Sequence, residues 1–371
     1  MPNYHRIVVK LGTSTLTAGA PTLSQPRLVE LTRQMANLHA SGSQVVLVTS
    51  GAVAAGKEAL HFPELPRFIP AKQMLAAVGQ PRLMGLYEQF FRVYGETIAQ
   101  VLLTRADLSD RRRYLNARGT LEALLNQRVI PVINENDTVA TEEIRVGDND
   151  TLSALVANLI EADLLVLLTD QSGLFTNDPR RDPAAHLITE VDSGEIPEEL
   201  WQAAGGSSTS LGTGGMLPKL RAADLARRAG CTVVIARGSD PDILLRIASG
   251  EPAGTRFLPL VSTLESRKRY LLAGKRSAGL VKIDNGAAAA IAQGGSLLPV
   301  GVRAVEGSFE RGDTVRVTTL AGKAVALGMA NYSAADLARL CGHQSAEIEP
   351  LLGYTFGDEA IHHNNLVLLS P

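Results

Sequence analysis

The chain has little cysteine, little net charge and no long apolar run. Its 371 residues include two cysteines, Cys231 and Cys341, whose wide separation does not indicate a disulfide framework or a zinc site. A net charge of −2 gives no overall attraction to nucleic acid or to an anionic membrane. The apolar runs are far shorter than the roughly 20 residues that a membrane-spanning helix needs. We therefore expect a cytoplasmic protein without a membrane partner.

Motifs of several common enzyme classes are missing as well. The segment Gly51–Lys57, GAVAAGK, begins like a P-loop, but Glu58 follows it where a serine or threonine would bind Mg²⁺. The dinucleotide-binding pattern GxGxxG fails because Leu217 stands at its third glycine position. There is no GxSxG motif, and the clustered histidines, His362 and His363, lie near the carboxyl end and are typical of surface residues. These absences argue against P-loop, dinucleotide-binding and serine-nucleophile chemistry.

Buried strands alternate with helices over the first 260 residues. With 45% hydrophobic and 20% charged residues, the chain is long enough for two globular domains. Strands that are apolar throughout and alternate with helices indicate a mostly parallel sheet covered on both faces, an α/β fold of three αβα layers. The predicted strands are residues 7–11, 45–48, 98–103, 129–133, 164–168 and 232–236, and the predicted helices follow Ser24 and Pro70 or cover residues 115–125, 152–160 and 219–228.

The pattern changes after about Arg269. Short strand-like segments at residues 279–283, 298–305, 313–318 and 323–329 are separated by glycine turns, which predicts a small β-barrel. We therefore expect a first domain over residues 1–262, a linker over 263–274 and a second domain over 275–371.

A dense polar segment separates the predicted strand 129–133 from the predicted helix 152–160. The ligand crevice of an open α/β sheet lies at this place, outside the carboxyl ends of the strands. Carboxylates and amides suit a molecule that carries an amine, or a metal, better than they suit a phosphate. The alternative is an ordinary solvated loop. The polar side chains are Asn134, Asn136, Asp137, Asp148, Asn149 and Asp150.

Three junctions between a strand and a glycine turn could receive phosphate or carboxylate groups. Gly12 follows the first strand, and Lys10 would place a charge beside its backbone amides. Ser50 and Gly51 follow the second strand and precede a helix, whose amino terminus attracts anions. The third junction is Gly212–Lys219, with the sequence GTGGMLPK. Each turn alone could be a simple tight bend, but three at strand ends favour an anion site.

Six segments of the chain resemble the glutamate 5-kinase family of amino acid kinases. They are VVKLGTS at 8–14, VTSGAVAAG at 48–56, VINENDTVAT at 132–141, VGDNDTLSA at 146–154, LLTDQSGLFTNDPR at 167–180 and GTGGMLPKL at 212–220. The tail resembles a PUA domain. The resemblance implies the amino acid kinase fold for residues 1–262. It also implies phosphoryl transfer from ATP to the side-chain carboxylate of glutamate, the first step toward proline, with Mg²⁺ held mainly by the ATP phosphates.

The same resemblance assigns roles to individual residues. It implies that the catalytic residues are Lys10, Lys219 and Asp150, with Asp150 orienting the two lysines. Glutamate would be bound by Ser50, Gly51, Asn134, Asp137, Asp148 and Asn149. ATP would be bound by Lys10, Gly12, Thr169, Asp170, Thr213, Gly214, Gly215, Met216 and Lys219. Leu217 and Pro218 depart from the family, which commonly has small polar residues before the second lysine.

The implied reaction needs no catalytic histidine, because a glutamate carboxylate is already ionised at neutral pH and needs no general base. This agrees with a sequence whose clustered histidines are typical of surface residues. Two alternatives remain from the residues themselves: a sister kinase with an aspartate-type substrate, and RNA binding through the tail. Residues 275–371 carry eight basic and nine acidic side chains, which argues against a nucleic-acid surface. The resemblance further implies feedback inhibition by proline and a homotetramer.

Overall fold

A computed structural model describes residues 4–65, 68–140, 149–205, 215–260 and 277–369. The chain forms two compact units, which we describe separately. The first contains Met1–Asp110 and Asn116–Thr263, and the second contains Arg111–Leu115 and Leu264–Pro371. The predicted linker, 263–274, lies outside the described residues, so the exact domain boundaries stay a prediction.

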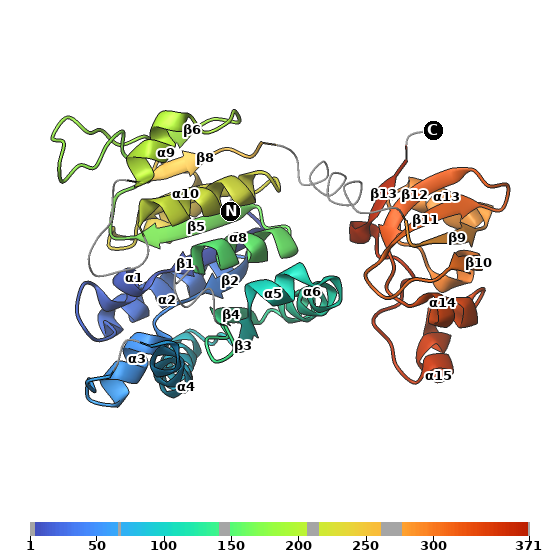
Figure 1. The fold of residues 1–371 in the computed structure, drawn as a ribbon, viewed down its shortest axis with the longest axis horizontal. Coiled ribbons are helices and arrows are strands. Elements are labelled where there is room, and N and C mark those ends of the chain that lie inside the picture. Colours follow the sequence, from blue (N-terminus) through green and yellow to red (C-terminus); the bar gives the residue numbers. More distant parts are fainter. Residues whose placement is uncertain (1–3, 66–67, 141–148, 206–214, 261–276, 370–371) are drawn as a thin grey trace. The chain divides into compact units, whose positions relative to one another are not determined.

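The first unit is built on an eight-stranded sheet with the order β3-β4-β2-β1-β5-β7-β8-β6 (Figure 1). Its paired strands run parallel except β7 and β8. The strands are β1 (Arg6–Leu11), β2 (Gln44–Val48), β3 (Ile98–Leu103), β4 (Ile130–Glu135), β5 (Leu164–Thr169), β6 (Glu190–Val191), β7 (Thr232–Arg237) and β8 (Thr255–Phe257). The helices are α1 (Thr13–Thr17), α2 (Gln25–Ala40), α3 (Ala52–Ala59), α4 (Ile69–Val93), α5 (Arg105–Ser109), α6 (Arg111–Asn126), α8 (Asn149–Leu159), α9 (Glu198–Gly205), α10 (Met216–Arg227) and α11 (Ile243–Ser249).

Helices cover both faces of this sheet because its central strands are apolar on both sides. Ile7 and Val9 of β1 belong to one core with Leu28 of α2, Tyr87 of α4 and Ile243 of α11. On the other face α8 packs against β1 and β5, and α10 packs against α8 and β7. The predicted three-layer αβα sandwich is therefore confirmed, and the six predicted strands are β1, β2, β3, β4, β5 and β7.

Two element boundaries at the polar segment differ from the sequence prediction. Strand β4 continues to Glu135, so Asn134 is a strand residue. Helix α8 already begins at Asn149, so Asn149 and Asp150 form its first turn instead of ending a loop. An acidic residue is favourable there because the amino-terminal end of a helix carries partial positive charge. Helix α1, directly after Gly12, was not predicted.

Helices α3 and α4 cross in direct backbone contact at two glycines. A Cβ atom added to Gly56 would lie 1.9 Å from the carbonyl oxygen of Leu75. A Cβ atom added to Gly79 would lie 1.8 Å from the carbonyl oxygen of Ala52 and 2.4 Å from the backbone nitrogen of Gly56. Only glycine fits at such an approach. The crossing holds α4 against the turn that follows β2.

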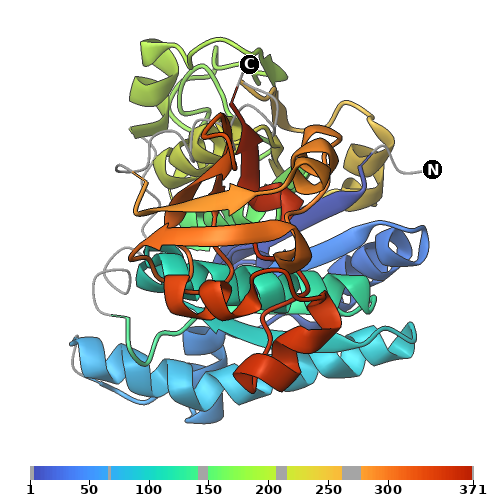
Figure 2. The ribbon, with the colours of Figure 1, turned by 90° about the vertical axis from the view of Figure 1, so that its right-hand side faces the viewer.

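The second unit contains a five-stranded sheet with the order β10-β9-β11-β12-β13, seen from a second direction in Figure 2. Its β9 and β11 are parallel and its other pairs are antiparallel. Three predicted strands are confirmed, whereas the predicted strand 298–305 starts at Val302, because Pro299–Gly301 forms a 3₁₀ turn. The elements are β9 (Gly279–Ile283), α13 (Asn285–Ala292), β10 (Val302–Gly307), β11 (Thr314–Thr319), β12 (Ala324–Met329), α14 (Ala334–Leu340), α15 (Ile348–Leu352) and β13 (Leu366–Leu368), with 3₁₀ turns at Pro299–Gly301, Ser345–Glu347 and His363–Asn365.

Within the described part of the chain, no helix combines the length and the apolar character that crossing a lipid bilayer requires.

Candidate active site

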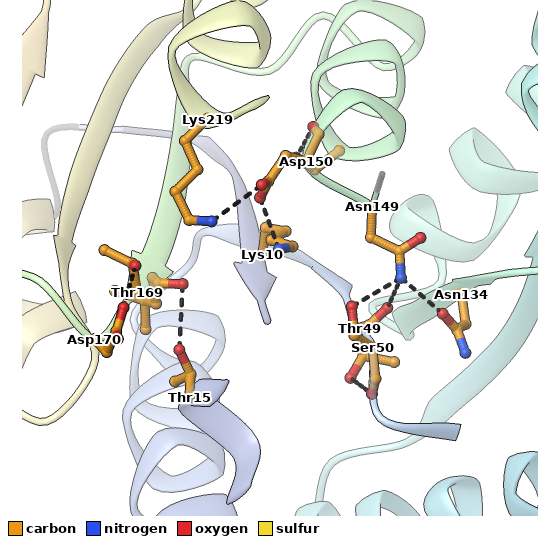
Figure 3. A network of polar contacts seen from close by, with 12 residues as sticks. Lys10, Thr15, Thr49, Ser50, Asn134, Asn149, Asp150, Thr169, Asp170 and Lys219 are labelled. Atoms are coloured by element: carbon orange, nitrogen blue, oxygen red, sulfur yellow. Dashed lines mark hydrogen bonds and ion pairs between the residues drawn. The ribbon is translucent and has the colours of Figure 1, made fainter. Parts of the chain in front are cut away.

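The predicted site residues gather at the carboxyl ends of four neighbouring strands (Figure 3). Lys10 lies near the end of β1 and Ser50 lies just beyond β2. Asn134 lies near the end of β4, and Thr169 is the last residue of β5. The parallel order of these strands brings side chains from distant parts of the sequence to one edge of the sheet. This is the edge where an open α/β sheet binds its ligand.

A buried carboxylate lies between two buried ammonium groups. The Asp150 Oδ1 atom lies 2.7 Å from Lys10 Nζ, and its Oδ2 atom lies 3.1 Å from Lys219 Nζ (Figure 3). Asp150 and Lys219 come from the first turns of α8 and α10. All three residues are at most 5% exposed. One carboxylate thus holds two cations at the same edge of the sheet.

The electrostatics of this cluster are set by opposing effects on Asp150. Burial alone would raise the pKa of the Asp150 carboxyl, because it disfavours the charged form. The positive charges of Lys10 and Lys219 outweigh burial and hold the pKa below its usual range. Asp150 is therefore ionised at neutral pH. The cluster carries a net positive charge and can receive an anion.

Next to the lysines lies a cluster of buried amides. The Asn149 Nδ2 atom donates to the Thr49 carbonyl oxygen at 2.7 Å, to Ser50 Oγ at 2.9 Å and to Asn134 Oδ1 at 3.0 Å (Figure 3). Asn134 Nδ2 in turn donates to Gln80 Oε1 of α4 at 2.8 Å. Sequence reasoning did not assign Gln80 to this site, because the residues around Gln73 to Gln80 were interpreted as a candidate subunit contact.

The third region of the site follows β5. Thr169 Oγ1 donates to Asp170 Oδ1 at 3.0 Å, and Thr15 Oγ1 donates to the Leu168 carbonyl oxygen at 3.3 Å (Figure 3). A small surface hollow begins at Gln171, the residue after Asp170, and reaches Met216, the first residue of α10. Its lining combines apolar and polar side chains. It consists of Gln171, Leu174, Phe175, Asn177, Asp178, Pro179, Ala203 and Met216.

Gly12 and Gly51 have conformational reasons to be glycine. A Cβ atom on Gly12 would lie 3.2 Å from Lys10 Nζ and would crowd the ammonium group. Gly51 has a φ of 100°, which disfavours any other residue. Gly215 lies in extended conformation at the amino-terminal cap of α10. Asp148, Thr213 and Gly214 lie outside the described residues, so their predicted roles stay predictions.

Comparison with known proteins agrees with this geometry. The family model of the amino acid kinase family matches residues 5–237. A glutamate 5-kinase of Shewanella amazonensis is 55% identical over 367 residues, which cover 99% of this chain and 96% of the relative. The chain belongs to the amino acid kinase family, among the glutamate 5-kinases.

Other comparisons extend over the rest of the chain. A glutamate 5-kinase of Deinococcus radiodurans is 55% identical over 365 residues and is covered over its full length, 100%. A PUA domain model matches residues 279–352, within the second unit. A solved structure of UMP kinase from Bacillus anthracis aligns with a TM-score of 0.47 and 14% identity, over 70% of this chain and 98% of that one. The glutamate 5-kinase family thus accounts for both units of this chain.

Proposed function

We propose that this chain transfers the γ-phosphoryl group of ATP to the side-chain carboxylate of L-glutamate. The product is L-glutamyl 5-phosphate, and the reaction is the first step of proline biosynthesis. The observation that carries this proposal is the buried Lys10–Asp150–Lys219 cluster, with its salt bridges of 2.7 and 3.1 Å. The glutamate 5-kinase relatives, which match both units, support the same reaction and do not favour a sister kinase.

The cluster answers the main difficulty of this reaction, which is repulsion between two anions. A glutamate carboxylate is ionised at neutral pH and attacks without a general base, but it must approach a negatively charged phosphate. Lys10 and Lys219 would place positive charge beside the transferring group, where charge-stabilising groups act most strongly. Asp150 would hold both ammonium groups in position before the substrates bind. The Asp150 carboxylate also lowers the net positive charge of the cluster, which reduces the free-energy cost of burying it.

We infer that Mg²⁺ enters with ATP and is held mainly by the ATP phosphates. When bound, it would neutralise part of their negative charge. Among the described residues, no group of three carboxylate, histidine or cysteine side chains could hold an ion. Asp150 already pairs with both lysines, so we assign it no metal. By the family resemblance, ATP would bind at Thr169, Asp170 and Met216.

A substrate panel tests the proposed reaction. We expect ATP-dependent formation of acyl phosphate, trapped as a hydroxamate with hydroxylamine, from glutamate but not from aspartate, acetylglutamate or UMP. Acetylglutamate lacks the free amine that Asp137 would bind. Hydroxamate from aspartate at a comparable rate would contradict the assignment of the substrate, and no turnover with any compound would contradict the reaction itself.

The pH dependence of glutamate binding is expected to follow Asp137. Burial raises the pKa of this half-buried carboxyl to about 6, because a charged group loses hydration there. Below pH 6 the carboxyl is protonated and no longer attracts the substrate ammonium, whereas the γ-carboxylate of glutamate stays ionised down to about pH 4.3. We expect KM for glutamate to rise up to about tenfold per pH unit as the pH falls from 6 to 5.

The measurement for this prediction is KM for glutamate and for ATP between pH 5 and 8. Asp137→Asn serves as the matched variant: its KM for glutamate should be raised at pH 7 and should not change in this pH range. Asp137→Ala should likewise raise KM for glutamate far more than KM for ATP. Equal changes in both KM values would show that Asp137 does not bind the amino acid.

Two further properties are proposed from the family resemblance. Proline carries the ammonium and α-carboxylate of glutamate, so we infer that it competes with glutamate and inhibits the enzyme; the hydroxamate assay with added proline tests this. We infer a homotetramer, which light scattering of the full chain would reveal as four times the mass of 39.4 kDa. A cytoplasmic location and the absence of RNA binding by the PUA domain stay predictions from composition and charge.

A further inference from the structure

The buried amides of the site form a chain whose polarity is set by backbone groups. The Thr49 carbonyl oxygen can only accept a hydrogen bond, so the Asn149 atom 2.7 Å away must be the amide nitrogen. The backbone N–H of Glu135 can only donate, so the Asn134 atom that it contacts at 2.9 Å must be the amide oxygen. These two assignments agree, because Asn149 Nδ2 also donates to Asn134 Oδ1. We call Asn149, Asn134 and Gln80 the amide relay.

The polarity of the relay determines which atoms remain at its two ends. Asn134 Nδ2 is a donor, so the Gln80 atom that it contacts at 2.8 Å must be the oxygen, and Gln80 Nε2 must lie on the other side. Gln80 Nε2 and Asn149 Oδ1 are both buried, and neither has a hydrogen-bond partner among the described residues. A buried polar atom without a partner costs about 1–3 kcal/mol. The relay therefore ends in one unsatisfied donor and one unsatisfied acceptor.

The placement of Gln80 on α4 directs it toward the amino acid side of the site. Gln73 lies seven residues earlier, two helical turns away and on the same face. Its Nε2 atom donates to the carbonyl oxygens of Thr138 and Ala140, both at 3.2 Å. Both glutamines thus contact the segment that contains Asp137. Gln73 contacts residues that follow Asp137, and Gln80 contacts Asn134, which precedes it. The close crossing at the neighbouring Gly79 fixes the position of α4.

We propose that Gln80 is a specificity-determining residue that recognises the α-carboxylate of the substrate. Its Nε2 atom donates to this carboxylate, while Asn149 Oδ1 accepts a hydrogen bond from the α-ammonium group. One donor and one acceptor, held by the same relay, match the head group of an α-amino acid. The proposal rests on the proposed function, because it adds a recognition residue to the same glutamate site.

The test combines Gln80→Glu with two substrates that each lack one group. Gln80→Glu keeps the oxygen that accepts from Asn134 Nδ2 and removes the donor. γ-Aminobutyrate keeps the reacting carboxylate and the amine but lacks the α-carboxylate, and glutarate lacks the amine. We expect the variant to lower kcat/KM for glutamate and for glutarate by about 10- to 100-fold, the range for a hydrogen bond to a charged group. The kcat/KM for γ-aminobutyrate and the KM for ATP should change less than twofold.

The same substitution at Gln89 provides the matched control, since Gln89 lies on the same helix and is exposed. Gln89→Glu should leave all substrates unaffected. If γ-aminobutyrate is turned over too slowly, its inhibition constant against glutamate replaces kcat/KM in the comparison.

Three results separate the possible failures. An equal loss of kcat/KM with glutamate and with γ-aminobutyrate would show that Gln80 acts only on the structure of the relay, and this would overturn the proposal. No loss with either substrate would overturn it as well. If Gln80→Glu does not fold, as judged by circular dichroism, Gln80→Met replaces it. The same two values, kcat/KM for glutamate and kcat/KM for γ-aminobutyrate, are then compared. A wild-type enzyme that does not phosphorylate glutamate would instead contradict the proposed function.

Discussion

Replacing Lys219 with alanine is expected to lower kcat by about 100-fold or more, and Lys10→Ala should have a similar effect. Removal of one preorganised charge-stabilising group commonly costs a factor of 10² to 10³ in kcat. Both ammonium groups are buried beside one carboxylate, so bulk water does not replace the missing charge. The measurement is the steady-state rate of hydroxamate formation at saturating glutamate and ATP.

Lys57→Ala is the control for these variants, because Lys57 is an exposed lysine on α3. It should retain wild-type kcat. Each active-site variant also leaves Asp150 with one cation fewer, which raises the cost of burying its charge. Thermal unfolding should therefore be measured in parallel, and kcat compared well below the transition. Turnover close to wild type in both Lys10→Ala and Lys219→Ala would refute the catalytic assignment.

Replacing Gly79 with alanine is expected to lower the free energy of unfolding by about 3 kcal/mol or more, the upper end of the usual cost of overpacking. The added methyl group would lie 1.8 Å from the Ala52 carbonyl oxygen and 2.4 Å from the Gly56 nitrogen. Both atoms belong to the backbone of α3, so no side-chain rotation can relieve the overlap and the helices must separate. Urea denaturation followed by circular dichroism measures the effect.

Gly85→Ala offers a matched control on the same helix. Gly85 is exposed, and an added Cβ would meet no atom within 4 Å. Alanine costs less conformational entropy than glycine in a helix, so Gly85→Ala should stabilise the protein by about 0.5–1 kcal/mol. Equal stabilities of the two variants would mean that α3 and α4 do not cross at backbone contact. Among Gly79→Ala molecules that fold, KM for glutamate should rise, since Gln80 is the next residue.

The larger sheet could be predicted from sequence because burial on both faces leaves a simple signature. Val8 and Val46 face one helical layer while Val9 and Leu47 face the other, so strands β1 and β2 are apolar at successive positions. Tail helix α13 was missed although Asp284 caps its amino terminus by accepting from the Ala287 N–H. Strand-like segments on either side hid this alanine-rich helix.

The site was predicted less completely than the sheet. The polar segment indicated its position, but the sequence prediction started the helix at residue 152, because the apolar periodicity begins only there, whereas the helix starts at Asn149. Lys10 and Lys219 are brought together by the order of the strands, which no local pattern contains. Gln80 left one weak signal: it and Gln73 are amide residues seven positions apart, and so on the same face of helix α4.

The strand order has a consequence for synthesis of the protein on the ribosome. Strand β1 leaves the ribosome first, yet it lies in the interior of the sheet between β2 and β5. At about 5–20 residues per second, the ribosome needs on the order of ten to forty seconds between Lys10 and Lys219. Strand β1 cannot pair with β5 before β5, which begins at Leu164, has been synthesised. Asp150 likewise cannot pair with Lys219 until that residue has been synthesised. A nascent chain therefore holds an apolar strand edge that cellular chaperones can recognise, and it acquires a complete catalytic centre only after most of the first unit has been translated.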